Sequence, residues 1–169
     1  MHQIHNNVNG YEWQEKGKEG TKCIFSNTGR RRLNILGAIS LTDLEITSFL
    51  TEANCNHNLI EIFLEEVRKQ YPKQKEIIIY LDNATYQRNQ KVQEKAKLLG
   101  ITLKYMPPYS PNLCLIERLW KFFKKKVMHN HYYETWDDFF AAVSEFFQKW
   151  ESWKHELTSL LSLKFEIIK

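Results

Sequence analysis

The sequence predicts an α/β domain in which helices flank a mixed β-sheet. Its segments run strands, helix, strand, helix, strand, helix, helix, an order that favours a layered α/β architecture. The hydrophobic period lengthens to three and four residues near Ile60, where the first helix is expected. A continuous apolar run at Ile77–Leu81 then ends at an acid, as in a buried parallel strand. The 169 residues fit one domain with a single hydrophobic core.

The first part of the chain contains the strand candidates. Three apolar segments separated by turn residues are expected to be strands: Cys23–Phe25, Leu33–Leu41 and Leu44–Leu50. An amphipathic helix follows, because apolar side chains recur at helical spacing at Ile60, Phe63, Leu64, Val67 and Tyr71. Pro72 ends this helix, since proline cannot continue its hydrogen bonding.

The middle of the chain predicts a strand, a helix and a second strand. Ile77–Leu81 is expected to be buried on both faces, as in a parallel strand inside a sheet. A short helix spans about Asn89–Leu99 and stops at Gly100, a residue suited to the position after a helix. Ile101, Leu103 and Tyr105 alternate with polar residues, which predicts a half-exposed strand.

Two helices are expected near the carboxyl end. Ser110 is the expected cap of the first, whose buried stripe would be Ile116, Leu119, Trp120, Phe123 and Val127. The second starts at Thr135, with Asp137 and Asp138 in its first turn. Its expected core stripe is Trp136, Phe139, Phe140, Val143, Phe147 and Trp150. The tail from Trp153 carries no functional signal.

Composition and charge limit the class of protein. The net charge is +4, which is mildly basic. The three cysteines are far apart, so neither a zinc ribbon nor a disulfide framework is expected. No apolar run is long enough to cross a bilayer, and no signal peptide is recognisable. We therefore expect a cytoplasmic protein without a membrane partner.

Two acids stand out by position. Asp82 closes the apolar run, and the carboxyl end of a parallel strand is where α/β folds place ligands. Taken alone, Asp82 is also explained by a turn in which its side chain caps the next loop. Glu117 lies in the first turns of a later helix, where ion pairs with Lys121 and Lys124 are the simpler explanation.

Two basic runs lie in the same sequence. Arg30, Arg31 and Arg32 form the first, and the second is a lysine run beside aromatic residues, Lys121, Lys124, Lys125 and Lys126. Either run alone is explained by a solvated face. Both together with the two acids favour phosphate binding.

Two longer motifs carry a family resemblance. LDNATYQ at Leu81–Gln87 and MPPYSPNLCLIERLWKFFKKKV at Met106–Val127 resemble the catalytic core of mariner-like DDE transposases and their bacterial insertion-sequence relatives. The 34 residues between Asp82 and Glu117 are typical of the bacterial branch. The resemblance begins near the amino terminus and continues to about Phe147.

The resemblance implies a ribonuclease-H-like mixed sheet flanked by helices over residues 1–150, with a tail of unknown role at 151–169. It implies that Asp82 and Glu117 are catalytic residues that bind Mg²⁺ or Mn²⁺ during DNA cleavage and strand transfer. DNA contacts are expected from Arg30, Arg31, Asn83, Arg118, Lys121, Lys124 and Lys125. The implied partners are transposon ends, target DNA and a second copy of the chain.

The sequence departs from the family pattern at its start. The segment His2–Asn6 resembles the stretch that follows the family's first catalytic Asp, so the first central strand and its acid would precede residue 1. Cys114-Leu115 also stands where relatives have Asn-Pro. We therefore expect weak Mg²⁺ binding and no DNA cleavage by the chain alone.

Three functions remain open from the sequence. The first is a transposase core, completed by the product of an upstream reading frame. The second is a non-catalytic remnant that binds DNA or dimerises. The third is another nuclease with the same fold.

Overall fold

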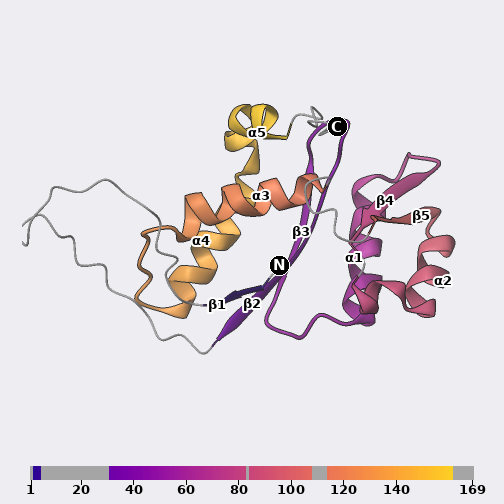
Figure 1. The fold of residues 1–169 in the computed structure, drawn as a ribbon, viewed down its shortest axis with the longest axis horizontal. Coiled ribbons are helices and arrows are strands. Elements are labelled where there is room, and N and C mark those ends of the chain that lie inside the picture. The colour runs from indigo at the N-terminus through magenta and orange to yellow at the C-terminus, as the bar shows by residue number, and fades with distance from the viewer. Residues whose placement is uncertain (1, 5–30, 83, 108–113, 162–169) are drawn as a thin grey trace, which may run out of the picture.

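A computed structural model describes residues 2–4, 31–82, 84–107 and 114–161 (Figure 1). Its strands are β1 (His2–Ile4), β2 (Arg32–Ile39), β3 (Ile46–Thr51), β4 (Ile77–Leu81) and β5 (Ile101–Tyr105). Its α-helices are α1 (His57–Gln70), α2 (Gln90–Leu98), α3 (Leu115–Phe123), α4 (Trp136–Gln148) and α5 (Lys154–Leu160). Short 3-10 helices η1 (Thr85–Arg88) and η4 (Trp150–Trp153) and a π-helical segment η3 (Lys124–Met128) complete the described elements. The strand expected at Cys23–Phe25 and the cap expected at Ser110 lie outside the described residues.

The described strands form two small sheets. Strand β2 lies between β1 and β3 and runs antiparallel to both, with Leu36 opposite Phe49. Strands β4 and β5 are parallel, with Tyr80 beside Lys104. The predicted α/β class, with both strand orientations and flanking helices, is confirmed.

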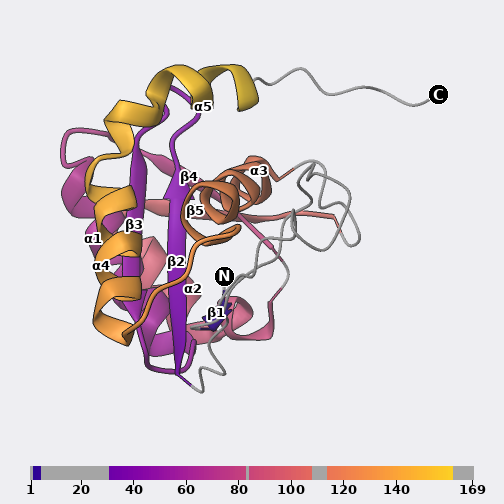
Figure 2. The same cartoon turned by 90° about the vertical axis from the view of Figure 1, so that its left-hand side faces the viewer.

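Strand β2 separates two hydrophobic cores. Helices α3 and α4 lie on one side of the β2–β3 hairpin, while α1, α2 and the β4–β5 pair lie on the other (Figure 1 and Figure 2). Leu33 and Ile35 point into the first core, with residues of α3, α4 and α5. Leu36 points into the second core, with residues of α1, α2 and β5. The elements that carry the two candidate acids therefore pack on opposite sides of one strand.

Helix α3 approaches β2 closely at Gly37. A Cβ atom at this position would lie 2.5 Å from Cη2 and 3.1 Å from Cζ2 of Trp120. The Trp120 ring is buried and meets Phe147 of α4 edge-on, with the ring centroids 6.4 Å apart. The absence of a side chain at Gly37 thus leaves the space that the Trp120 ring fills.

The helix boundaries follow local signals in the sequence. Helix α1 ends before Pro72, as predicted, and the side chain of Asn56 caps its start. Gly100 follows α2 with φ of +67°, a left-handed conformation that favours glycine. Thr135 and Asp138 form a reciprocal capping box at the start of α4, which confirms the predicted start.

Three expectations about individual positions are corrected. Strand β4 is not buried on both faces, because the described helices cover only one face and leave Ile78 45% and Tyr80 54% exposed. Phe140 is exposed and Phe146 is buried, so the apolar stripe of α4 is rotated from the expected one. Strand β3 starts two residues later than expected, because Leu44 adopts φ of +60° in the turn after β2.

The last described helix belongs to the first core. Leu157 of α5 is fully buried and Leu161 is 3% exposed, and both pack with residues of α3 and α4. The division of the chain at residue 150 stays a prediction, but α5 contributes packing to the preceding residues. None of the described helices is long and apolar enough to cross a membrane.

Candidate functional site

Asp82 directly follows the last residue of β4. Its side chain is exposed, and its Oδ1 atom accepts a hydrogen bond from the backbone N–H of Ala84 at 3.3 Å. This hydrogen bond is the turn-forming interaction expected if the Asp82 side chain caps the loop after β4. A single accepted bond leaves the carboxylate with further acceptor capacity, so it does not exclude a ligand role.

Glu117 lies in the first turn of α3 and is exposed. Its backbone N–H donates to the carbonyl of Cys114 at 3.1 Å, and the Cys114 side chain does not cap the helix. Within the described residues Glu117 forms no ion pair with Lys121 or Lys124. Ion pairing within the helix therefore does not explain why an acid lies at this position. A carboxylate at a helix start is also stabilised by the helix dipole.

The thiol of Cys114 shows that the two acids share one neighbourhood. Burial raises the pKa of Cys114 most, and the negative charges of Glu117 and Asp82 raise it further. Both carboxylates are thus close enough to act on the same sulfur atom. Asp82 also contributes to the raised pKa of Tyr86, whose main cause is burial. The strand end at Asp82 and the helix start at Glu117, with 34 residues between them in the chain, thus both lie within electrostatic reach of this thiol.

The donor chemistry of this pair suits a hard divalent cation. Mg²⁺ prefers oxygen ligands and retains several waters, so a few carboxylates suffice to hold it. Among the described residues, however, no group of three or more His, Cys, Asp or Glu side chains could hold a metal ion. The assignment of Asp82 and Glu117 as metal ligands therefore stays a prediction.

The predicted DNA-binding residues differ in their surroundings. Lys121 and Lys125 are exposed, whereas Lys124 is half-buried. Arg118 donates from Nη1 to the backbone carbonyl of Leu160 at 3.2 Å, which ties α3 to α5. Arg30 and Asn83 lie outside the described residues. Their roles at DNA, like those of the lysines, stay predictions.

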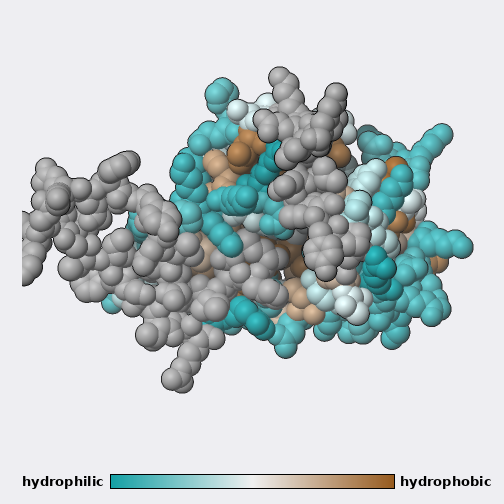
Figure 3. Space-filling model, viewed as in Figure 1, coloured by the Kyte–Doolittle hydropathy of each residue, from teal (hydrophilic) through white to brown (hydrophobic). Residues whose placement is uncertain are grey.

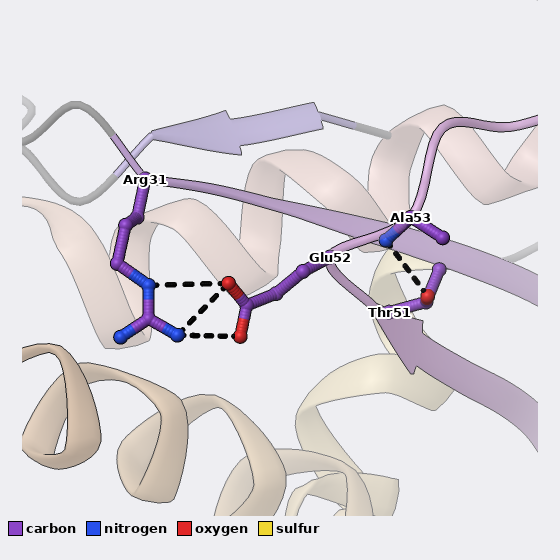
Figure 4. A network of polar contacts seen from close by, with 4 residues as sticks. All are labelled: Arg31, Thr51, Glu52 and Ala53. Carbon is purple, nitrogen blue, oxygen red and sulfur yellow. Dashed lines mark hydrogen bonds and ion pairs between the residues drawn. The ribbon is translucent and has the colours of Figure 1, made fainter.

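Arg31 has a structural environment that the sequence did not indicate. Its guanidinium donates to both carboxylate oxygens of Glu52, and the Nη2–Oε1 distance is 2.7 Å (Figure 4). The Arg31 Cζ atom also lies 4.4 Å from the ring centroid of Trp136. These contacts join the chain just before β2 to the end of β3 and the start of α4. The positive charge of Arg31, which the sequence suggested for phosphate binding, is therefore already paired with Glu52.

Sequence reasoning missed two residues close to Asp82. Tyr80 is the second residue before Asp82 and points to the open side of β4. Lys104 is its neighbour on β5, and its Nζ atom lies 5.8 Å from the Tyr80 ring centroid. The signal was present in the pattern of β5, where polar residues alternate with apolar ones, but the pairing register was needed to place Lys104 beside Tyr80.

Comparisons with known proteins identify the family and the fold of the chain. The profile of a family described as DDE superfamily endonuclease matches residues 2–139. The paired-end complex of Mos1 transposase with the left transposon end is similar in structure, with a TM-score of 0.63 and 12% identity. The Mos1 mariner paired-end complex with Mn has the same TM-score and identity. A search of curated proteins found no match.

The match to the Mos1 chains covers nearly the whole of this chain. The alignment with each of these two complexes spans 98% of this chain and 55% of the Mos1 chain. The chain therefore spans about half the length of the Mos1 transposase structures it matches. At this level of identity the likeness establishes the ribonuclease-H-like fold.

Proposed function

Since the chain belongs to the DDE superfamily endonucleases, we propose that it is part of the catalytic core of a DNA transposase. In this proposal Asp82 and Glu117 hold Mg²⁺ or Mn²⁺ at a DNA phosphodiester. The reaction class is metal-dependent strand cleavage followed by transfer of the cut end into a target. The observation that carries the proposal is the placement of two exposed carboxylates, Asp82 directly after β4 and Glu117 in the first turn of α3, within electrostatic reach of the same Cys114 thiol.

The chemistry of phosphodiester cleavage explains the choice of residues. When bound, divalent ions activate the attacking oxygen and stabilise the charge on the leaving oxygen of an in-line displacement. The two carboxylates supply negative charge and oxygen ligands from an exposed position, where a large polyanionic substrate has access. Related solved structures include Mos1 paired-end complexes with Mn and with Mg. Use of either metal by this chain is part of the proposal.

The basic residues of α3 and η3 would hold the DNA. Lys121 is one helical turn after Glu117, and Lys125 is two turns after it. Both lysines are exposed and form no ion pair with another described residue. An unpaired lysine gains most from a phosphate partner, and such contacts position the duplex without reading its sequence.

We further propose that the chain alone binds the metal weakly and does not cut DNA. Two carboxylates leave half of the charge of two divalent ions uncompensated, and the described residues offer no third ligand beside them. A third carboxylate would then come from outside the described residues. Its source would be the rest of this chain, a second copy, or the product of an upstream reading frame.

Metal titration tests the site directly. Mn²⁺ binding is followed by the electron paramagnetic resonance of the free ion for the wild-type chain, Asp82→Asn and Glu117→Gln. Loss of either carboxylate is expected to weaken binding by about tenfold or more. Glu151→Gln is the matched control, because it removes the same charge from an exposed residue on η4. Equal affinities for all four proteins would refute the metal site.

A nicking assay tests whether the chain is complete. Supercoiled plasmid is incubated with the wild-type chain and Mn²⁺, and no relaxed product is expected. Nicking that is absent in Asp82→Asn would show that the chain supplies every ligand it needs, contrary to the proposal of weak binding and inactivity.

A non-catalytic DNA-binding protein is the second candidate function. The lack of a third ligand among the described residues favours it. It predicts that DNA affinity is unchanged by Asp82→Asn and does not depend on divalent ions. The transposase core predicts that Mn²⁺ strengthens DNA binding by the wild-type chain and has a smaller effect on Asp82→Asn.

A further inference from the structure

We propose that the uncovered face of the β4–β5 pair is a DNA-binding surface that leads to Asp82. We call it the β4–β5 outer face and define it by Ile78, Tyr80, Thr102 and Lys104. Tyr80 would stack on an unpaired base and Lys104 would contact a phosphate. The inference rests on the proposed function, because it assumes that DNA is the substrate at Asp82.

The strand register places these four residues on one side. Ile78 pairs with Thr102, and Tyr80 pairs with Lys104. Side chains of paired positions point to the same side of a sheet, and those of consecutive residues point to opposite sides. Ile77, Ile79 and Leu103 accordingly pack against the core formed with α1 and α2. No element within residues 31–82, 84–107 and 114–161 covers the outer face, where Ile78 is 45% and Tyr80 is 54% exposed.

The outer face ends at the candidate site. Asp82 is the next position after Ile78 and Tyr80 in the same alternation, and it is exposed as they are. Two residues of a strand span about 6.6 Å. That length equals about two base-pair steps of 3.4 Å along a duplex. DNA whose phosphodiester reaches Asp82 from the β4 side therefore passes over Tyr80 and Lys104.

The chemistry of the outer face matches a nucleic acid. The Lys104 ammonium lies 5.8 Å from the Tyr80 ring centroid and forms no ion pair among the described residues. Thr102 donates a hydrogen bond to the Glu76 carboxylate at 2.9 Å, so it belongs to the border of the face. An exposed aromatic ring beside an unpaired cation is the combination that binds bases and phosphates of unpaired strands.

A second copy of the chain is a poorer occupant of this face. Stable interfaces bury roughly 800 Å² on each partner, with an apolar centre. The outer face offers two partly exposed apolar side chains. The surface over β4, β5 and α2 is mostly hydrophilic with a few hydrophobic residues among it (Figure 3). The positive charge of Lys104 is complementary to a polyanion, so DNA fits this face better than a second copy does.

Binding to labelled oligonucleotides tests the inference. Fluorescence anisotropy is measured for the full chain with a 20-base single strand and with the matching duplex, at several salt concentrations. Tyr80→Ala is expected to weaken single-strand binding about five- to 150-fold, the range for loss of one stacked base. Tyr80→Phe is expected to retain most of the affinity, because the ring remains. Lys104→Gln is expected to lower the salt slope by about one on both DNAs.

Matched controls separate local from general effects. Lys91→Gln removes the same charge from an exposed position on α2, and Leu98→Ala removes a side chain that is 84% exposed at the end of that helix. Both are expected to bind DNA as the wild type does. Circular dichroism is expected to show an unchanged fold for every variant.

The outcomes distinguish the inference from the proposed function. Unchanged DNA binding in Tyr80→Ala and Lys104→Gln would overturn the inference, while metal binding that depends on Asp82 would leave the proposed function intact. Equal weakening by Lys91→Gln would also overturn it, because the effect would then be one of net charge. Self-association that is lost in Tyr80→Ala with unaltered DNA affinity would assign the face to a second copy instead.

Discussion

Alanine in place of Gly37 would put a methyl group into the contact between β2 and α3. The new Cβ would lie 2.5 Å from Cη2 of Trp120, whereas carbon atoms in contact are normally about 3.5–4.0 Å apart. The Trp120 ring would have to move by about 1 Å. Its neighbour Phe147 packs edge-on against it, so the shift would spread into α4.

The expected cost follows from studies of overpacked cores. Inserting a methyl group into a well-packed site costs about 1–3 kcal/mol. For a domain of this size, each kcal/mol lowers the melting temperature by roughly 2–4 °C. Gly37→Ala is therefore expected to melt roughly 2–12 °C below the wild type. Thermal unfolding followed by circular dichroism measures this shift.

Two further variants identify the contact as the cause. Trp120→Phe removes the ring atoms nearest to the new methyl group, so Gly37→Ala should cost less in that background. Gly100→Ala is the control: its φ of +67° disfavours alanine, but the nearest atom is 3.7 Å away. It should destabilise the chain equally in both backgrounds. An unchanged melting temperature for Gly37→Ala, or equal costs in the two Trp120 backgrounds, would refute the reasoning.

Three other predictions concern separate parts of the molecule. Asp82→Asn should lower the pKa of Cys114, because it removes a negative charge that raises this pKa. Iodoacetamide at pH 8 should then alkylate Cys114 faster, measured with the other two cysteines replaced by serine. An unchanged rate would mean that Asp82 does not act on the Cys114 thiol. Leu157→Ala should cost about 2–5 kcal/mol in urea unfolding, whereas Leu160→Ala, 39% exposed, should cost well under half as much; similar costs would contradict the packing of α5. Arg31→Ala should cost about 1 kcal/mol, since the ion pair with its carboxylate partner is largely solvated; a cost above about 3 kcal/mol would indicate a buried pair.

Local sequence signals predicted the helices and strands well, but not which of their faces are covered by other elements. The run at Ile77–Leu81 correctly predicts a parallel strand, because five successive apolar residues suit one. Whether both faces are covered depends on where other elements pack, and no local pattern contains that information. The exposure of Tyr80 is therefore a tertiary property. The start of α4 was predictable because Thr135 and Asp138 bond within one turn.

The candidate site was predictable to a different degree for each residue. Asp82 and Glu117 were found from motifs and spacing, and their shared effect on Cys114 agrees with a common site. The pairing of Arg31 with Glu52 joins positions 21 residues apart, so no local rule could indicate it. The position of Lys104 beside Tyr80 likewise required the register of β4 and β5. Contacts distant in sequence account for the residues that were missed.

The position of β2 explains how the two acids are held relative to one another. Asp82 follows a strand that packs with α1 and α2, whereas Glu117 lies on a helix that packs with α4 and α5. These two cores meet through the opposite faces of β2, so a shift in either core changes the separation of the carboxylates. Helix α3 is seated on β2 through Trp120, one turn after Glu117. Under the proposed function, Gly37→Ala should therefore weaken Mn²⁺ binding in the titration as well as stability, although it touches neither acid.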